Sequence, residues 1–230
     1  MPLIVHHLQV SQSERVTWLC EELGIDYDLR LYERAPLLAP PAFKALHFSE
    51  AAPVIDDGSL RLAESGACLE YISHRHGGGK FTVSPQDPAY ADYLYWWHWA
   101  NGSFQPVIGR LMSAKMAGVG DVDPIVKNAT HKFGKFLGAL EDRLSGNDWL
   151  AGTEEITLAD IMVVFSLTTM RYFCPYSLKE YPAILKYLQR VSQREAYQKA
   201  MKKSDPNMAL VLGADEPESF ILAAKKAGKL

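Results

Sequence analysis

Residues 3–34, LIVHHLQVSQSERVTWLCEELGIDYDLRLYER, carry the pattern that decides the fold of the first part of the chain. The run at 3–8 is apolar and β-rich, which predicts a strand. Apolar residues then recur at helical spacing, namely Val16, Leu19, Cys20 and Leu23. That spacing predicts a helix, and Gly24 ends it. Residues 26–34 alternate apolar and polar side chains, so the whole stretch predicts a βαβ unit with a parallel strand pair.

Ser11, at the start of the predicted helix, has two interpretations. Ser11-Gln12-Ser13-Glu14 fits the S-x-x-E capping box, in which the hydroxyl accepts from a backbone N–H and Glu14 reaches back. A helix N-terminus also favours an anion such as a thiolate, because its N–H groups are free and the macrodipole is positive there. The local sequence is compatible with both roles.

The next fifty residues complete an α/β module. After a proline-rich loop and a short helical turn, Asp57-Gly58 stands between two short apolar runs, which is a strong hairpin signal. Residues 64–80 then show a helical pattern that the glycines at 77–79 end. The predicted order over residues 1–80 is therefore β-α-β-α-β-β-α.

Beyond residue 87 the pattern changes to long helices without a convincing strand. We therefore predict two domains, an α/β domain at 1–80 and an all-helical domain at 87–205, joined by a linker near 77–87. The tail at 206–230 is compatible with a last helix or with an irregular course.

Composition narrows the class of protein. The net charge is −3 with no basic stripe, which argues against nucleic-acid binding. No apolar run approaches the roughly 20 residues of a membrane helix, and the start lacks a signal-peptide pattern. Three cysteines, an odd number without metal spacing, indicate reduced core thiols in an intracellular protein: Cys20, Cys68 and Cys174. Four histidines lack the partner spacing of a zinc site: His6, His7, His74 and His76.

Three further motifs have structural explanations first. Thr157-x-x-Asp160 is a capping box, and Ile156 with Ile161 forms a hydrophobic staple around it. Pro53 precedes a strand and by itself reads as an ordinary trans edge proline, although a cis bond would free the backbone for an extended ligand.

Glu64-Ser65 reads first as a helix cap, and a helix start with a hydroxyl would also hold a carboxylate. The aromatic run at 90–104 is by default core packing. It is too dense for one helix face, so some rings must point toward the other domain or a partner.

Taken together and in order, these motifs resemble the soluble glutathione transferases, from Ile4 to about residue 203. The set comprises Ser11-x-Ser13-x-Arg15, Trp18, Glu21 to Leu23, Pro53 after a small residue, Glu64-Ser65, Trp149 to Gly152 and Thr157-x-x-Asp160. The stretch from Asn101 to Pro106 is similar to the fourth helix of fungal, yeast-type serine transferases.

The resemblance implies a thioredoxin-like first domain that binds glutathione as co-substrate without a metal, a helical second domain and a homodimer. Ser11, with Ser13 as second candidate, would hydrogen-bond the glutathione sulfur. Ala52, before a cis Pro53, would pair with the cysteinyl part. Glu64 and Ser65 would bind the γ-glutamyl end. A hydrophobic electrophile would lie near Tyr95, Trp96, Trp99, Asn101 and Phe104.

One segment departs from the family. Relatives usually read Pro-x-Gly-Lys before the cis proline, but this chain reads Phe48-Ser49-Glu50-Ala51. The cation expected to hold the glycyl carboxylate is missing, and Glu50 would repel that carboxylate. Either another cation, such as His47 or Lys44, substitutes, or glutathione binds more weakly or is not the preferred ligand.

Two functions therefore follow from the resemblance. The first is a glutathione transferase that attacks a hydrophobic electrophile, by conjugation or peroxide reduction. The alternative is a non-catalytic ligand-binding or scaffolding relative. Cys20 is a poor substitute for the serine, because it lies on the apolar face of the helix. The expected compartment is the cytoplasm, although the C-terminal Gly228-Lys229-Leu230 loosely resembles a peroxisomal address.

Overall fold

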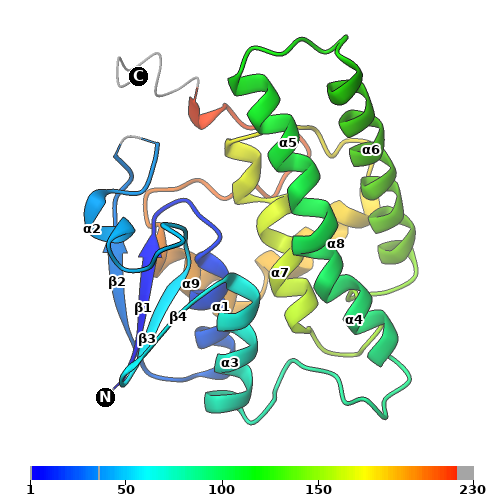
Figure 1. The fold of residues 1–230 in the computed structure, drawn as a ribbon. Helices are drawn as coiled ribbons and strands as arrows, with labels where there is room; N and C mark the ends of the chain where they lie inside the picture. Colours follow the sequence, from blue (N-terminus) through cyan, green and yellow to red (C-terminus); the bar gives the residue numbers. More distant parts are fainter. Residues whose placement is uncertain (1, 36, 222–230) are drawn as a thin grey trace. The chain divides into compact units, whose positions relative to one another are not determined.

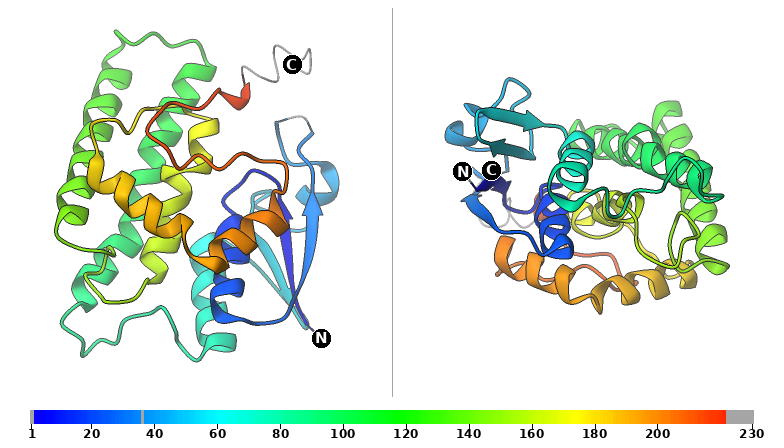
Figure 2. Two further views of the ribbon diagram at one scale, coloured as in Figure 1. Left: turned by 180° about the vertical axis from the view of Figure 1, so that it is seen from behind. Right: turned by 90° about the horizontal axis from the view of Figure 1, so that it is seen from below.

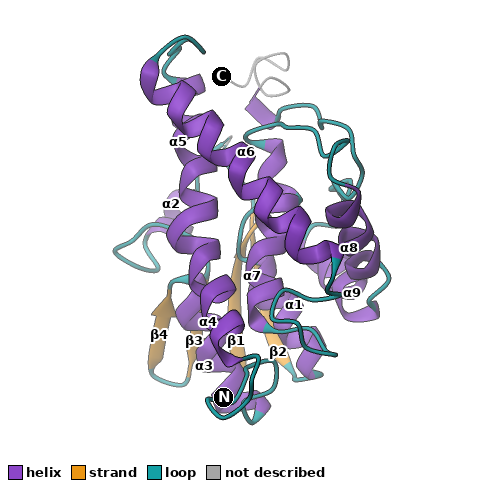
Figure 3. Cartoon of the chain, turned by 90° about the vertical axis from the view of Figure 1, so that its right-hand side faces the viewer, coloured by secondary structure: helices purple, strands orange, loops and turns teal. Residues whose placement is uncertain are grey.

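The computed structural model describes residues 2–35 and 37–221 of the 230-residue chain. Within these residues the chain forms two compact units. Unit 1 contains residues up to 82 and returns at 191–210, and unit 2 contains 83–190 and 211–220. All strands belong to unit 1, and the rest of the described chain is helix and loop (Figure 3).

Unit 1 has the predicted β-α-β-α-β-β-α order (Figure 1). Its elements are β1 (Leu3–Leu8), α1 (Glu14–Leu23), β2 (Tyr27–Tyr32), α2 (Pro41–Lys44), β3 (Val54–Asp57), β4 (Leu60–Ala63) and α3 (Ser65–Gly77). The sheet order is β2-β1-β3-β4, with β1 parallel to β2 and the other pairs antiparallel. This is the thioredoxin-like arrangement expected from the sequence.

The hairpin turns one residue later than the Asp57-Gly58 signal suggested. Asp57 pairs with Leu60, so the two loop residues are Gly58 and Ser59. Gly58 has a φ of 63°, a conformation that glycine adopts without steric cost. The glycine therefore specifies the turn, while Asp57 ends the strand.

Both faces of β1 are covered. Leu3, Val5 and His7 alternate along one face and are buried. On the other face Leu8 packs with Phe43 of α2 and Val54 of β3. Because His7 is a polar residue at a fully buried position, its ring nitrogens need polar partners inside the unit.

A helix from the end of the chain completes unit 1. Helix α9 (Glu195–Ser204) packs along α1, as Figure 2 shows. Trp18 and Tyr197 meet edge to face with ring centroids 5.0 Å apart. Arg194 forms an ion pair with Glu22. Residues 191–210 thus cluster with the α/β unit, which differs from the predicted boundary at residue 205, because an amphipathic helix pattern does not say which domain the helix covers.

The predicted capping box of Ser11 is wrong. Helix α1 begins at Glu14, and its N-cap is Ser13, which makes no side-chain cap bond. Ser11 lies in the turn before the helix, where its hydroxyl donates to the carbonyl of Leu8 at 2.7 Å and accepts from the amide of Ser13 at 3.2 Å. At the other end Gly24 is the left-handed C-cap, as predicted.

Unit 2 is built from helices. They are α4 (Tyr90–Trp99), the π-helical η1 (Ala100–Phe104), α5 (Gln105–Met116), α6 (Pro124–Ser145), α7 (Leu158–Leu167), the 3₁₀ turn η2 (Thr169–Tyr172) and most of α8 (Pro182–Ser192). All ten residues of α7 are buried, so it is the central helix of the unit. The described part of the chain holds no helix that is long and apolar enough to span a membrane.

The capping box at the start of α7 is confirmed. Thr157 donates its hydroxyl to Asp160, whose carboxylate also accepts from the amide of Thr157, the amide of Leu150 and the hydroxyl of Tyr187. Burial raises the pKa of Asp160, and these donors oppose the rise.

The tail has an irregular course over residues 205–219. Arg171 holds part of it in unit 2 by donating to the carbonyls of Gly213 and Asp215. The Gly228-Lys229-Leu230 sequence lies outside the described residues.

Replacing Asp160 by Ala should lower the stability of unit 2. Four buried donors would lose their acceptor, which we expect to lower the free energy of unfolding by about 3 kcal/mol or more. Urea denaturation measures the change. Glu154→Ala, at an exposed position before the same helix, is the control and should change stability by less than about 0.5 kcal/mol. Equal effects of the two substitutions would contradict the capping role.

Candidate functional site

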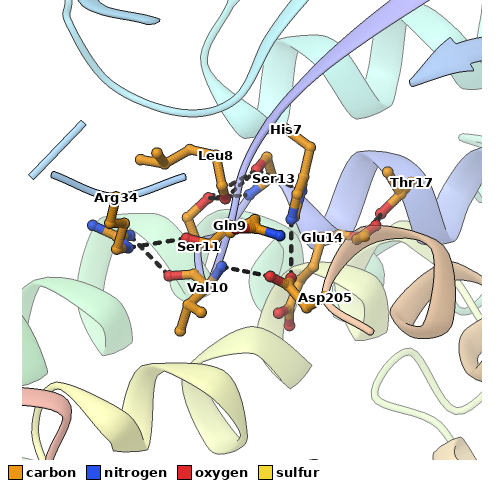
Figure 4. Close-up of polar contacts among 11 residues, drawn as sticks. His7, Leu8, Gln9, Val10, Ser11, Ser13, Glu14, Thr17, Arg34 and Asp205 are labelled. Carbon is orange, nitrogen blue, oxygen red and sulfur yellow. Dashed lines mark hydrogen bonds and ion pairs between the residues drawn. The ribbon is translucent and has the colours of Figure 1, made fainter. Parts of the chain in front are cut away.

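The turn between β1 and α1 is held in an unusual conformation. Val10 has a φ of 53°, in the left-handed region that β-branched residues rarely adopt. Its amide donates to Asp205 Oδ1 at 2.8 Å, and its carbonyl accepts from Arg34 Nη2 at 2.8 Å (Figure 4). Such conformations persist where surrounding contacts impose them, and they are common at functional sites.

Two serine hydroxyls follow this turn. Ser11 Oγ and Ser13 Oγ lie 2.8 Å apart, and both are within hydrogen-bonding distance of the Leu8 carbonyl, at 2.7 and 3.2 Å. Ser11 keeps 5% of its surface exposed, whereas Ser13 keeps none. Of the two predicted candidates, Ser11 is therefore the one that a ligand can reach.

A buried histidine and aspartate stand behind Ser13. His7 Nδ1 is 2.9 Å from Ser13 Oγ, and His7 Nε2 is 2.9 Å from Asp205 Oδ2 (Figure 4). A carboxylate only accepts hydrogen bonds, so Nε2 carries a proton. In a neutral imidazole Nδ1 then accepts the proton of the Ser13 hydroxyl.

A second network ties the serine turn to the predicted ligand-binding backbone. Gln12 Nε2 donates to the carbonyl of Ala52 at 2.8 Å, and Arg15 Nη1 donates to Gln12 Oε1 at 2.9 Å and to Ser65 Oγ at 3.1 Å. Arg15 is fully buried, and this burial lowers its pKa to about 9, so it stays positively charged at neutral pH.

The Ala52-Pro53 peptide bond is cis. The trans form favoured by the local residues is thus wrong, and the cis form implied by the family resemblance is correct. Glu64 is the N-cap residue of α3, as predicted, but it has a φ of 74°, is exposed and makes no side-chain cap bond. Ser65 is the first residue of α3 and is buried.

The divergent segment at 48–51 is also left-handed at one position. Glu50 has a φ of 51°, in the left-handed region that favours glycine. Its carboxylate lies 3.8 Å from Lys44 Nζ, and His47 Nδ1 lies 2.9 Å from Ser49 Oγ. Lys44, one of the two predicted substitutes, therefore faces a carboxylate of its own chain.

The predicted hydrophobic-site residues lie in unit 2 and differ in accessibility. Tyr95 is 56% exposed, and Asn101 is half-buried on η1. Trp96 and Trp99 are buried, and Phe104 is fully buried, stacked on Trp99 at 4.7 Å. Phe104 is thus a support for Trp99, and its predicted direct contact with a substrate does not fit this burial.

The cysteines do not offer an alternative nucleophile. Cys20, Cys68 and Cys174 are all buried free thiols. Burial raises the pKa of each, to about 12 for Cys68. In the described residues no group of histidine, cysteine and carboxylate side chains could hold a metal ion.

Five polar side chains of this site had no site role predicted from the sequence: His7, Gln12, Arg15, Arg34 and Asp205. An arginine in the first turn of an apolar helix is a usable signal for Arg15. Asp205 lies 198 residues from its partner His7, and nothing in the local pattern indicates that contact.

Comparison with known proteins gives a consistent picture. Family models match two segments, "Glutathione S-transferase, N-terminal domain" at residues 11–75 and "Glutathione S-transferase, C-terminal domain" at 109–195. Glutathione S-transferase 3 of Schizosaccharomyces pombe is 29% identical over 219 residues, covering 89% of each chain. Glutathione S-transferase 1 of Saccharomyces cerevisiae is 27% identical, covering 89% of this chain and 96% of the relative.

Solved structures agree in fold. A glutathione S-transferase from Actinobacillus pleuropneumoniae is 31% identical, with a TM-score of 0.80, over 91% of this chain and 98% of that one. A Phanerochaete chrysosporium glutathione transferase solved with oxidized glutathione is 18% identical, with a TM-score of 0.70, over 88% and 94%.

Glu50→Gly should stabilise the protein. Glycine adopts a positive φ without the Cβ clash, so we expect a gain of about 1 kcal/mol in the free energy of unfolding. Ala51→Gly, next to it and without a positive φ, is the control and should lose about 0.5 to 1 kcal/mol. A loss for both variants in chemical denaturation would show that the left-handed position carries no strain.

Proposed function

Because this chain belongs to the glutathione S-transferase family, we propose that it activates the thiol of glutathione with the hydroxyl of Ser11. The observation that carries the proposal is the position of Ser11, which of the two candidate serines is the one that keeps exposed surface, in a turn fixed from both sides and just before the N-terminus of α1. A free thiol has a pKa of about 8.5, and hydrogen-bond donors aimed at the sulfur lower it.

Ser11 supplies such a donor by rotation. Its hydrogen now points to the Leu8 carbonyl, while its oxygen accepts from the Ser13 amide. A hydroxyl turns freely about its C–O bond, so the hydrogen can move from Leu8 to a sulfur placed beside Ser11. The thiolate is then stabilised by this bond and by the positive end of α1.

The rest of glutathione fits groups of unit 1. Ala52, in its cis peptide, offers its backbone to the cysteinyl part. The γ-glutamyl end carries both an ammonium and a carboxylate. Glu64 would pair with the ammonium, while Ser65 and the N-terminus of α3 would hold the carboxylate, with the charge of Arg15 close by.

The glycyl end is the weaker part of the proposed site. Glu50 would repel the glycyl carboxylate, and its contact with Lys44 reduces what that cation can offer. Glu50 is exposed and Lys44 is partly exposed, so solvent screens the repulsion. We therefore propose moderate affinity for glutathione.

The second substrate is a hydrophobic electrophile bound near Tyr95, Trp96, Trp99 and Asn101. Attack of the thiolate on a carbon gives conjugation, and attack on a peroxide gives reduction. Ser11 and the yeast relatives support a serine transferase of the yeast type. Phe48 is 93% exposed, which supports an apolar contact with a second copy in a homodimer. Three free buried cysteines support a cytoplasmic location.

A second candidate function rests on the segment at 48–51. If Glu50 prevents productive glutathione binding, the protein is a ligand-binding relative without turnover. Ser11 then has only a structural role, in the turn before α1.

Ser11→Ala separates the two functions. As a transferase, the variant should bind glutathione within about threefold of wild type but lose about 10²-fold in turnover with chlorodinitrobenzene, because one donor to the developing anion is gone. Calorimetry measures binding, and the conjugate absorbance measures turnover. Ser59→Ala, exposed in the hairpin, should match wild type. Turnover that survives in Ser11→Ala, or is absent from wild type, contradicts the proposal.

A further inference from the structure

Ser13, His7 and Asp205 form a buried hydrogen-bonded series that the proposed function does not use. They come from the turn after β1, from β1 itself and from the residue after α9. The distances are 2.9 Å from Ser13 Oγ to His7 Nδ1 and 2.9 Å from His7 Nε2 to Asp205 Oδ2 (Figure 4). Ser13 and His7 have no exposed surface, so Ser13 cannot itself attack a substrate as the serine of a hydrolase does.

The series continues to one further side chain, Ser11. Ser11 Oγ lies 2.8 Å from Ser13 Oγ, and Ser11 is the one among the two serines and His7 that keeps exposed surface. The four groups thus connect the proposed sulfur position to a buried carboxylate without a break.

The proton positions follow from the chemistry of each group. Asp205 accepts the Val10 amide on Oδ1 and the His7 Nε2–H on Oδ2. Nδ1 of a neutral His7 therefore accepts, and it takes the hydrogen of Ser13. Ser13 Oγ then offers only lone pairs to Ser11, so Ser11 donates to it once the Ser11 hydrogen turns from the Leu8 carbonyl toward Ser13.

We propose that His7, backed by Asp205, takes up the thiol proton of bound glutathione through Ser11 and Ser13. This relay rests on the function proposed above. The thiol hydrogen passes to Ser11 Oγ, the Ser11 hydrogen passes to Ser13 Oγ, and the Ser13 hydrogen passes to His7 Nδ1. The sulfur keeps the electron pair of the broken S–H bond, and His7 becomes an imidazolium paired with Asp205.

The end state has every donor aligned toward the sulfur. His7 Nδ1–H donates to Ser13, Ser13 donates to Ser11, and Ser11 donates to the thiolate. Chains of hydrogen bonds oriented in one direction strengthen each other. The charges also compensate each other, because the His7 imidazolium lies between the Asp205 carboxylate and the thiolate.

The charged groups around His7 are consistent with this role. Asp205 contacts it directly, while Arg34, from the loop after β2, and Glu14, at the start of α1, lie near the same turn (Figure 4). Asp205 also holds the Val10 amide. One carboxylate therefore fixes both the turn that presents Ser11 and the ring that receives the proton.

Nitrogen-15 NMR of His7 in the wild-type protein tests the relay without any substitution. At about pH 7, glutathione should convert the His7 ring to the doubly protonated form, whereas S-methylglutathione, which has no thiol proton, should leave it neutral. The same response to both ligands would overturn the relay. Glutathione that forms a thiolate while His7 stays neutral would do so as well.

Ser13→Ala tests the path itself. The variant should bind glutathione normally but release about one proton to solvent for each thiolate formed, while wild type releases few. Calorimetry in two buffers of different ionisation enthalpy counts these protons. Turnover should fall about 10²-fold at pH 6.5, with a deficit that shrinks above the pKa of about 8.5 of a free thiol.

Thr17→Val is the matched control, because it removes an equally buried hydroxyl one turn further along α1 and outside the relay. It should keep the wild-type proton count and pH profile. If Ser13→Ala matches Thr17→Val while Ser11→Ala loses turnover, the relay is wrong and the proposed function stands. If wild type binds no glutathione, the proposed function fails first.

Discussion

Two hydrogen bonds hold Val10 in a left-handed conformation, and the rest of the site depends on this constraint, here called the Val10 clamp. A valine in the left-handed region costs about 1 to 3 kcal/mol, and this one is held by Asp205 at its amide and by Arg34 at its carbonyl. The chain reverses there so that Ser11 falls before the helix. In this turn the Ser11 hydroxyl bonds the Leu8 carbonyl and the Ser13 amide, and Ser11 is not the N-cap that its sequence suggests.

The Val10 clamp also links the α/β unit to a residue near the end of the chain, because Asp205 accepts the Val10 amide. Asp205 follows α9, and α9 packs on α1 through Trp18 and Tyr197. The packing of α9 on α1 thus places the Asp205 carboxylate beside the Val10 turn, 195 residues earlier in the chain. Stability of unit 1 and geometry of the candidate site are coupled through this single residue, because loss of the helix packing would move the group that holds Val10 and His7.

Local sequence signals predicted what local interactions determine. The order of strands and helices, the glycine of the hairpin, the end of α1 at Gly24 and the Thr157 capping box were all confirmed, since each depends on residues a few positions apart. The failures have the opposite character. The cap role of Ser11, the partner of His7 and the unit to which α9 belongs depend on long-range contacts. Phe104 looked like a lining residue because composition alone cannot distinguish a core ring from a pocket ring.

In the proposed function, Ser11 and its surroundings convert bound glutathione to a thiolate near neutral pH. Ultraviolet difference spectroscopy of the wild-type protein with glutathione, followed from about pH 5 to 9, measures this directly. Thiolate absorbance of the bound ligand should appear well below the pKa of about 8.5 of a free thiol. Bound glutathione that titrates like the free thiol would contradict the proposed function.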